Sequence, residues 1–165
     1  MPDLAGWFFD SVTLSNFALA DGLHVLTVRY RGRGFVATQV VDELTRGVLA
    51  GYAPLAGCLK LVDKGILRVA SLDKIERVTY GQLSAHLGPG ESGTIAAAGH
   101  RQEVGVTDDL AARRACADMA IPMTGIIGIV RAAVRDRQLA LTDANDLLRT
   151  MVESGLHSPM QRLPG

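Results

Sequence analysis

The stretch WFFDSVTLSNF, from Trp7 to Phe17, combines a short apolar run, an aspartate and the start of a helical pattern. An apolar run without alternation indicates a strand that is buried on both faces, as in a parallel sheet. Four further runs of this kind predict strands over Phe35–Thr38, Ile66–Ala70, Val104–Thr107 and Ile121–Thr124. Strands that alternate with helices favour right-handed βαβ units, so the sequence predicts an α/β fold. We expect a three-layer α/β/α sandwich with a central, mainly parallel five-stranded sheet.

The helical patterns lie between and after these runs. Helices are expected over Ser11–Leu23, Gln39–Gly47, Pro54–Lys64, Leu72–Leu87 (as one helix or two), Glu91–Arg101, Leu110–Met119, Ile126–Asp136 and Thr142–Ser154. The segment Arg29–Arg33 holds three arginines in five residues and is expected as a loop, either simply solvated or in contact with phosphate. Residues 1–155 are expected to form a single domain and residues 156–165 an irregular tail.

The composition excludes several classes of protein. The chain has 165 residues, with 17 Lys and Arg against 17 Asp and Glu, which argues against a surface coated in positive charge. The two cysteines, Cys58 and Cys116, are isolated, so a disulfide scaffold or a zinc ribbon is not expected. The longest apolar stretch, Met119–Val130, is interrupted and too short to span a membrane. Since the first residues do not resemble a signal peptide, we expect a cytoplasmic protein.

Acidic residues are placed where an open α/β sheet has its site, beyond the carboxyl ends of the strands. Asp10 ends the first strand, Glu43 lies on the helix after the second, Glu91 opens a helix, and Asp108 and Asp109 follow the fourth strand. Each acid alone also fits a carboxylate at a helix start. Together they would repel one another unless a cation lay between them, and oxygen ligands select Mg²⁺ or Mn²⁺.

Five segments, in order, resemble the motifs of the PIN-domain family. They are Phe9–Phe17, Val40–Leu44, Gly90–Ala96, Val106–Asp109 with Ala111–Arg114, and Ile121–Gly125. The resemblance runs from about residue 8 to 155 and rests on the order and spacing of the motifs. Members of this family are mostly metal-dependent ribonucleases, and many are the toxins of bacterial toxin–antitoxin pairs (the VapC-like branch).

The resemblance implies roles for individual residues. Asp10, Glu43 and Asp109 match acidic positions that hold metal, Mg²⁺ or Mn²⁺, and Asp108 shares that role as a neighbour. Glu91 is expected to assist catalysis. Ser11 and Asn16 match polar positions that orient Asp10, and Thr107 matches one that bonds to the water around the metal. Arg113 and Arg114 are expected either to contact RNA phosphates or to form an intrahelical ion pair with Asp109. Expected partners are RNA, an antitoxin protein and a second copy of the chain in a homodimer, and no membrane.

One departure from the family pattern concerns Gly93. Where the closest branch has two glutamates, in Gly-Glu-Ala-Glu-Ala-Ile-Ala, this sequence has Glu91 and Gly93. If the second glutamate supplies a ligand, that ligand is missing here and Glu91 has to replace it. The alternative to a ribonuclease is therefore a weakened or inactive PIN-like module that binds RNA or a protein. The same segment matches G-x-G-x-x-G, but a helix and not a strand is expected before it, which argues against a dinucleotide site.

Overall fold

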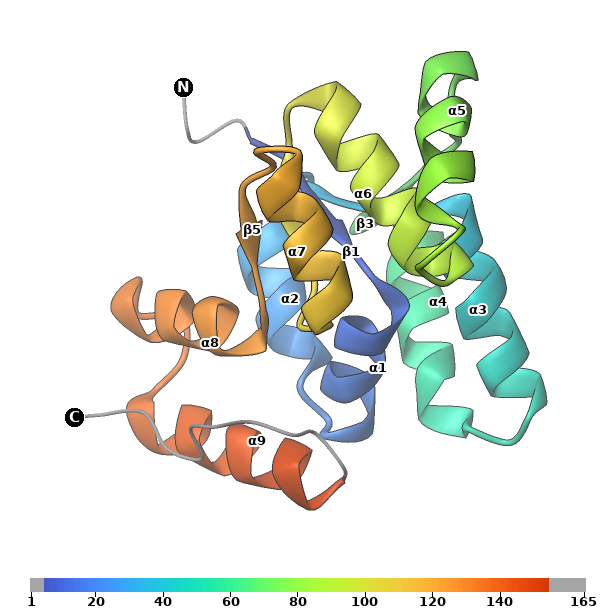
Figure 1. The fold of residues 1–165 in the computed structure, drawn as a ribbon. Helices are drawn as coiled ribbons and strands as arrows, with labels where there is room; N and C mark the ends of the chain where they lie inside the picture. Colours follow the sequence, from blue (N-terminus) through green and yellow to red (C-terminus); the bar gives the residue numbers. More distant parts are fainter. Residues whose placement is uncertain (1–4, 155–165) are drawn as a thin grey trace.

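The computed structural model describes residues 5–154, in which a parallel sheet of five strands carries helices on both faces (Figure 1). The strands are β1 (Trp7–Phe9), β2 (Gly34–Ala37), β3 (Leu67–Ala70), β4 (Val104–Val106) and β5 (Met123–Thr124). The helices are α1 (Ser11–Leu19), α2 (Leu23–Tyr30), α3 (Thr38–Leu49), the short 3₁₀ helix η2 (Ala53–Leu55), α4 (Ala56–Asp63), α5 (Lys74–Leu83), α6 (Pro89–Arg101), α7 (Leu110–Asp118), α8 (Ile126–Arg135) and α9 (Leu141–Glu153). The predicted three-layer α/β/α architecture is confirmed.

The strand order, β3-β2-β1-β4-β5, determines where a site can form. All neighbouring strands are parallel, and Phe8 of β1 pairs with Phe35 of β2 on one side and with Gly105 of β4 on the other. The chain builds outward from β1 through β2 to β3, then returns to place β4 on the other side of β1. The order therefore reverses between β1 and β4, and a crevice is expected at the carboxyl ends of these two strands.

Successive residues of β1 face opposite layers, which explains its unbroken apolar run. Phe8 packs in a cluster with Ile95 of α6 and Cys116 of α7, whereas Phe9 packs with residues of α1 to α4, α8 and α9. Both phenylalanines are completely or almost completely buried. The sheet is thus covered by α5, α6 and α7 on one face and by the remaining helices on the other (Figure 1).

Two expectations about individual segments were wrong. The helix expected over Ser11–Leu23 ends at Leu19, because the chain turns at Asp21, which has a positive φ of 56°. A second helix, α2, follows and includes Arg29 and Tyr30, which had been expected in a loop. The domain limit at residue 155 and the tail over 156–165 lie outside the described residues.

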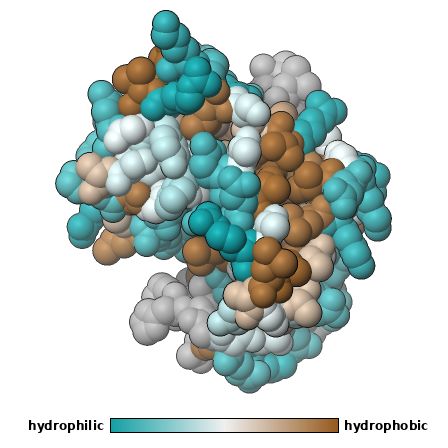
Figure 2. Space-filling view, turned by 90° about the vertical axis from the view of Figure 1, so that its right-hand side faces the viewer, coloured by the Kyte–Doolittle hydropathy of each residue, from teal (hydrophilic) through white to brown (hydrophobic). Residues whose placement is uncertain are grey.

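The outer surface carries several exposed apolar side chains. Figure 2 faces the side on which α3 and α5 lie and shows apolar areas next to hydrophilic ones. Leu49 at the end of α3, Val69 on the edge strand β3, and Ile75 and Val78 on α5 are exposed. Within residues 5–154, no helix is both long enough and apolar enough to cross a membrane.

Candidate active site

Asp10 follows β1 directly and is 99% buried. Its Oδ1 accepts a hydrogen bond of 2.8 Å from the backbone amide of Thr13, which caps α1. Its Oδ2 is buried and has no hydrogen-bond partner among the described residues. Burial raises the pKa of Asp10, and the negative charge of Asp108 acts in the same direction, although Thr107 and Thr13 oppose the shift. A buried carboxyl group with one unmatched oxygen favours either a proton or a cation beside it.

Asp108 and Asp109 follow β4, on the other side of the point where the strand order reverses. The Asp109 amide donates to Thr107 Oγ1 at 3.2 Å, and Asp109 Oδ2 accepts from the Ala112 amide at 2.9 Å, which caps α7. Asp108 Oδ2 accepts from the Ile126 amide at 2.9 Å, at the start of α8. Both aspartates therefore stabilise helix N-termini by accepting hydrogen bonds from backbone amides that have no partner within the helix.

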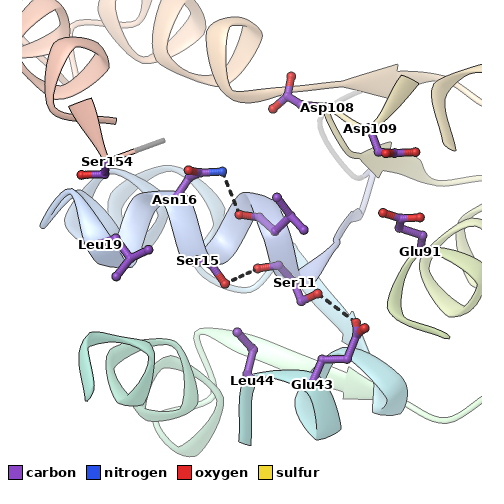
Figure 3. A pocket seen from close by; sticks show the side chains of 11 residues that line it. Ser11, Ser15, Asn16, Leu19, Glu43, Leu44, Glu91, Asp108, Asp109 and Ser154 are labelled. Atoms are coloured by element: carbon purple, nitrogen blue, oxygen red, sulfur yellow. Dashed lines mark hydrogen bonds between the residues drawn. The ribbon is translucent and has the colours of Figure 1, made fainter. Parts of the chain in front are cut away.

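Glu43 reaches the same edge from α3. Ser11 Oγ donates a hydrogen bond of 2.9 Å to Glu43 Oε1, as Figure 3 shows. Position 90, near the start of α6, has no side chain, and a Cβ built there would collide with Glu43 Oε1 and lie 3.3 Å from Ser11 Oγ. Gly90 thus allows α6 to approach the Ser11–Glu43 pair closely. From the sequence, Gly90 was placed in the PIN-like segment Gly90–Ala96 and in a dinucleotide pattern, which the helix α5 before it excludes, but this close approach was not predicted.

Glu91 interacts electrostatically with Asp109, which follows β4, and with Asp10 and Glu43, which follow β1 and β2. It lies in the first turn of α6, and Figure 3 shows its carboxylate between Asp109 and Glu43. Burial raises the pKa of Glu91, and the negative charges of Asp109, Asp10 and Glu43 raise it further, against a backbone hydrogen bond that lowers it. A carboxyl whose pKa is raised by several other acids indicates that their charges act on one region.

Four acids line an open cleft of about 490 Å³, and buried Asp10, which is not among the lining residues, lies next to its wall at Ser11. Glu43, Glu91, Asp108 and Asp109 line it, and the rest of its wall is formed by Ser11, Val12, Ser15, Asn16 and Leu19 of α1, Leu44 of α3 and Ser154. No lysine or arginine is among the described residues of this wall. In residues 5–154, no group of three or more His, Cys, Asp and Glu side chains is arranged closely enough to hold a metal ion as the side chains stand.

Ser11 and Asn16, which were expected to orient Asp10, form hydrogen bonds with other groups. Ser11 bonds to Glu43, and Asn16 Nδ2 donates to the backbone carbonyl of Val12 at 3.0 Å. The Asp10 carboxylate is held by the Thr13 amide, and the side chains of Thr107 and Thr13 also favour its charged form. Neither Ser11 nor Asn16 bonds to Asp10 among the described contacts, because α1 turns both side chains toward the cleft. The role expected of them toward Asp10 stays a prediction.

Gly93 does not point at the acids. A Cβ at this position would lie 2.8 Å from Gln39 Oε1 and 3.2 Å from the Ala37 Cβ, at the start of α3. The structure thus gives Gly93 a packing role, since α3 and α6 approach each other closely there. Glu91, two residues earlier, is the acid of this segment that lines the cleft.

Arg113 is engaged beside the cleft. Its Nη1 donates to the Thr107 carbonyl at 3.0 Å and lies 4.0 Å from Asp108 Oδ1. The ion pair that α-helical spacing suggested, with Asp109, is thus formed with Asp108 instead. Arg114 is exposed on the outer side of α7.

In a comparison with protein-family models, residues 7–163 match a model described as a PIN domain. A search of the curated proteins finds no relative of this chain. The match covers nearly the whole chain, including β1 with Asp10, the Glu43 and Glu91 helices and the loop after β4. This protein therefore belongs to the PIN-domain family, whose fold is that of nucleases.

Proposed function

We propose that this protein is a ribonuclease that depends on Mg²⁺ or Mn²⁺ and hydrolyses phosphodiester bonds of RNA in the acidic cleft. The observation that carries the proposal is the set of carboxylates at the point where the strand order reverses, with one oxygen of buried Asp10 left unmatched. Nuclease chemistry is the activity of the family to which the chain belongs.

The chemistry of the donor set fits a hard divalent cation. The acids offer only oxygen atoms, which favour Mg²⁺ and Mn²⁺ over softer metals. Asp10 and Asp109 would hold the ion from the two sides of the crevice, with Glu43, Glu91 and Asp108 near them. Such an ion, when bound, lowers the pKa of a neighbouring water and offsets the negative charge of phosphate oxygens. Since no ready-made ligand group is present among the described residues, side-chain rotation has to complete the site.

The protein's own groups divide the remaining work. The Thr13 amide fixes Asp10, and the Ser11 hydroxyl together with the close approach of Gly90 fixes Glu43. Glu91, whose pKa is raised by burial and by its acidic neighbours, is suited to take the proton of the water that attacks the phosphorus atom. The displaced oxygen of the RNA then takes a proton from solvent.

Cleavage of labelled single-stranded RNA tests the proposal. We expect cleavage with Mg²⁺ or Mn²⁺ and none in excess chelator, and we expect Asp10→Asn to abolish it. Asparagine retains the oxygen that caps α1, so the substitution removes charge while preserving the fold. Asp63→Asn is the matched control, since Asp63 is exposed at the end of α4 and lines no part of the cleft. Equal cleavage by wild type and Asp10→Asn would refute the proposal.

The proposal extends to a toxin of a toxin–antitoxin pair, which rests on the resemblance to the VapC-like branch. Expression of the wild type in a bacterium should then arrest growth, and Asp10→Asn should relieve the arrest. If the protein binds RNA but neither cleaves it nor arrests growth, it is instead the inactive module that binds RNA.

A further inference from the structure

The cleft cannot attract RNA by its own charge. Glu43, Glu91, Asp108 and Asp109 line it without a lysine or arginine among the described residues. The nearby Arg113 already bonds to the Thr107 carbonyl and faces Asp108. The backbone of RNA is a chain of negative charges, and the acidic wall of the cleft repels it. A bound cation could offset the charge of one phosphate but not of its neighbours. Affinity for a polyanion has to come from positive groups elsewhere on the protein.

Several arginines lie near the amino ends of the strands, at the edge of the sheet opposite to the acids. The arginine patch is formed where the end of α2 and the turn into β2 meet the end of α8, and it consists of Arg29, Arg31, Arg33, Arg135 and Arg137. Arg29 Nη1 donates to Asp136 Oδ2 at 2.6 Å and to Gln138 Oε1 at 3.0 Å. These two bonds join the two segments, which are more than 100 residues apart in the sequence.

The arginine patch has an excess of positive charge. Within residues 5–154, the acid that bonds to Arg29 and Arg135 is Asp136. Hydrogen bonds from Arg135 and Arg29 together hold the pKa of Asp136 well below its usual range. Even with Arg33 left aside, four arginines therefore lie beside one aspartate in the part of the chain that the structure describes. Arg31, Arg135 and Arg137 are exposed, and the structure gives Arg31 and Arg137 no hydrogen bond or ion pair among the described residues.

The arginine patch lies at the amino ends of the strands, whereas the acids lie at the carboxyl ends. The Arg33 guanidinium packs over the ring of Trp7, the first residue of β1, at 5.2 Å, and its Nη2 donates to the Arg29 carbonyl at 3.0 Å. β1 is three residues long and therefore spans about 10 Å between the amino-end edge and the carboxyl-end edge of the sheet. A short piece of single-stranded RNA is long enough to reach from one to the other.

We propose that the arginine patch binds the sugar–phosphate backbone of the RNA that enters the acidic cleft. The planar guanidinium group matches two phosphate oxygens at once, which makes a set of converging arginines suited to this ligand. The choice of RNA, rather than another polyanion, rests on the function proposed above. The patch supplies binding strength and the cleft supplies chemistry.

Anisotropy of a fluorescein-labelled single-stranded oligoribonucleotide, in excess chelator and about 0.1 M salt, tests the arginine patch without cleavage. The variant Arg31→Gln/Arg137→Gln removes two exposed charges that hold no described partner. Each lost phosphate contact weakens binding about 5-fold at this salt concentration, so we expect Kd to rise about 25-fold for the two contacts together. The slope of log K against log salt should become shallower by about 1.4. The matched control, Lys64→Gln/Arg68→Gln, removes two exposed charges near β3 and should leave Kd within about 2-fold.

The only tryptophan provides a second, local readout. Trp7 lies under Arg33, so RNA bound at the arginine patch should change its emission, and Arg31→Gln/Arg137→Gln should shift the midpoint of that change upward. Equal loss of affinity in the control variant, or unchanged affinity in the patch variant, overturns the inference. So does a polyglutamate peptide that binds the patch as tightly as RNA, since the patch then suits an acidic protein segment.

The inference and the proposed function fail in different ways. If the protein cleaves RNA with Mn²⁺ but the patch variant keeps its Kd and KM, the function stands and the patch assignment is wrong. If the patch variant binds RNA about 25-fold more weakly but no condition gives cleavage, the patch assignment stands and the nuclease proposal is wrong.

Discussion

Gly90→Ala tests the close approach of α6 to the Glu43 carboxylate. The new methyl group would collide with Glu43 Oε1, so the carboxylate has to rotate away and lose its hydrogen bond from Ser11. Loss of this half-exposed bond costs about 1 kcal/mol, and a poor rotamer costs about another 1 kcal/mol. Replacing glycine by alanine in a helix returns about 0.5–1 kcal/mol. We expect a net destabilisation of about 1 kcal/mol, together with a large loss of RNA cleavage.

Gly81→Ala is the matched control, because Gly81 lies in α5 and a Cβ there would meet nothing within 4 Å. It should stabilise the protein by about 0.5–1 kcal/mol and leave cleavage unchanged. Urea unfolding measures both free energies, and a single-turnover assay with Mn²⁺ measures both rates. If Gly90→Ala stabilises the protein as much as Gly81→Ala does and cleaves RNA at the wild-type rate, then Gly90 does not position Glu43.

Two further changes test packing around α6. Glu76 is completely buried and accepts bonds from Arg101 at 2.8 and 2.9 Å, whereas the Arg101 side chain is 35% exposed. Glu76→Gln should therefore lower the free energy of unfolding by about 1.5 kcal/mol in urea at neutral pH. The hydrogen bonds from Arg101 lower the pKa of Glu76 in the folded protein. The stability that ionised Glu76 contributes is therefore complete above the ordinary carboxyl pKa and is lost as the pH falls through the lowered pKa. If the free energies of unfolding of wild type and Glu76→Gln stayed a constant distance apart below about pH 5, this reasoning would be contradicted. Gly93→Glu should destabilise the folded protein by about 2 kcal/mol, because the new side chain would collide with Gln39, and it should not tighten Mn²⁺ binding. Tighter Mn²⁺ binding in calorimetry would show that position 93 faces the acids.

Much of the fold follows from local pattern. The run at Val104–Val106 is buried on both faces because it lies inside a parallel sheet, and this is why unbroken apolar runs identified the strands. The helix α2 was missed because Leu23–Tyr30 is rich in residues with weak helix propensity. Burial of Val25, Leu26 and Tyr30 stabilises it instead, and that burial depends on tertiary packing.

The site was predictable as a location but not as a set of contacts. Asp10 and Asp109 end parallel strands, so a common edge follows from the fold class alone. The partner of Ser11 could not be predicted in the same way, since its bond to Glu43 depends on how α1 and α3 are placed relative to each other. The close approach at Gly90 likewise depends on the position of α6 against α3, which no spacing along the chain encodes.

Binding of Mn²⁺ by the wild type and by Asp10→Asn, measured by isothermal titration calorimetry, tests the central claim most directly. The account predicts a saturable site in the wild type, because the unmatched Oδ2 of Asp10 and the charges around Glu91 favour a cation in the cleft. Asp10→Asn should weaken that binding at least 10-fold while its thermal unfolding stays close to that of the wild type, and Asp63→Asn should bind like the wild type. The same Mn²⁺ affinity in wild type and Asp10→Asn would contradict the account, because the ion would then bind outside the acidic cleft.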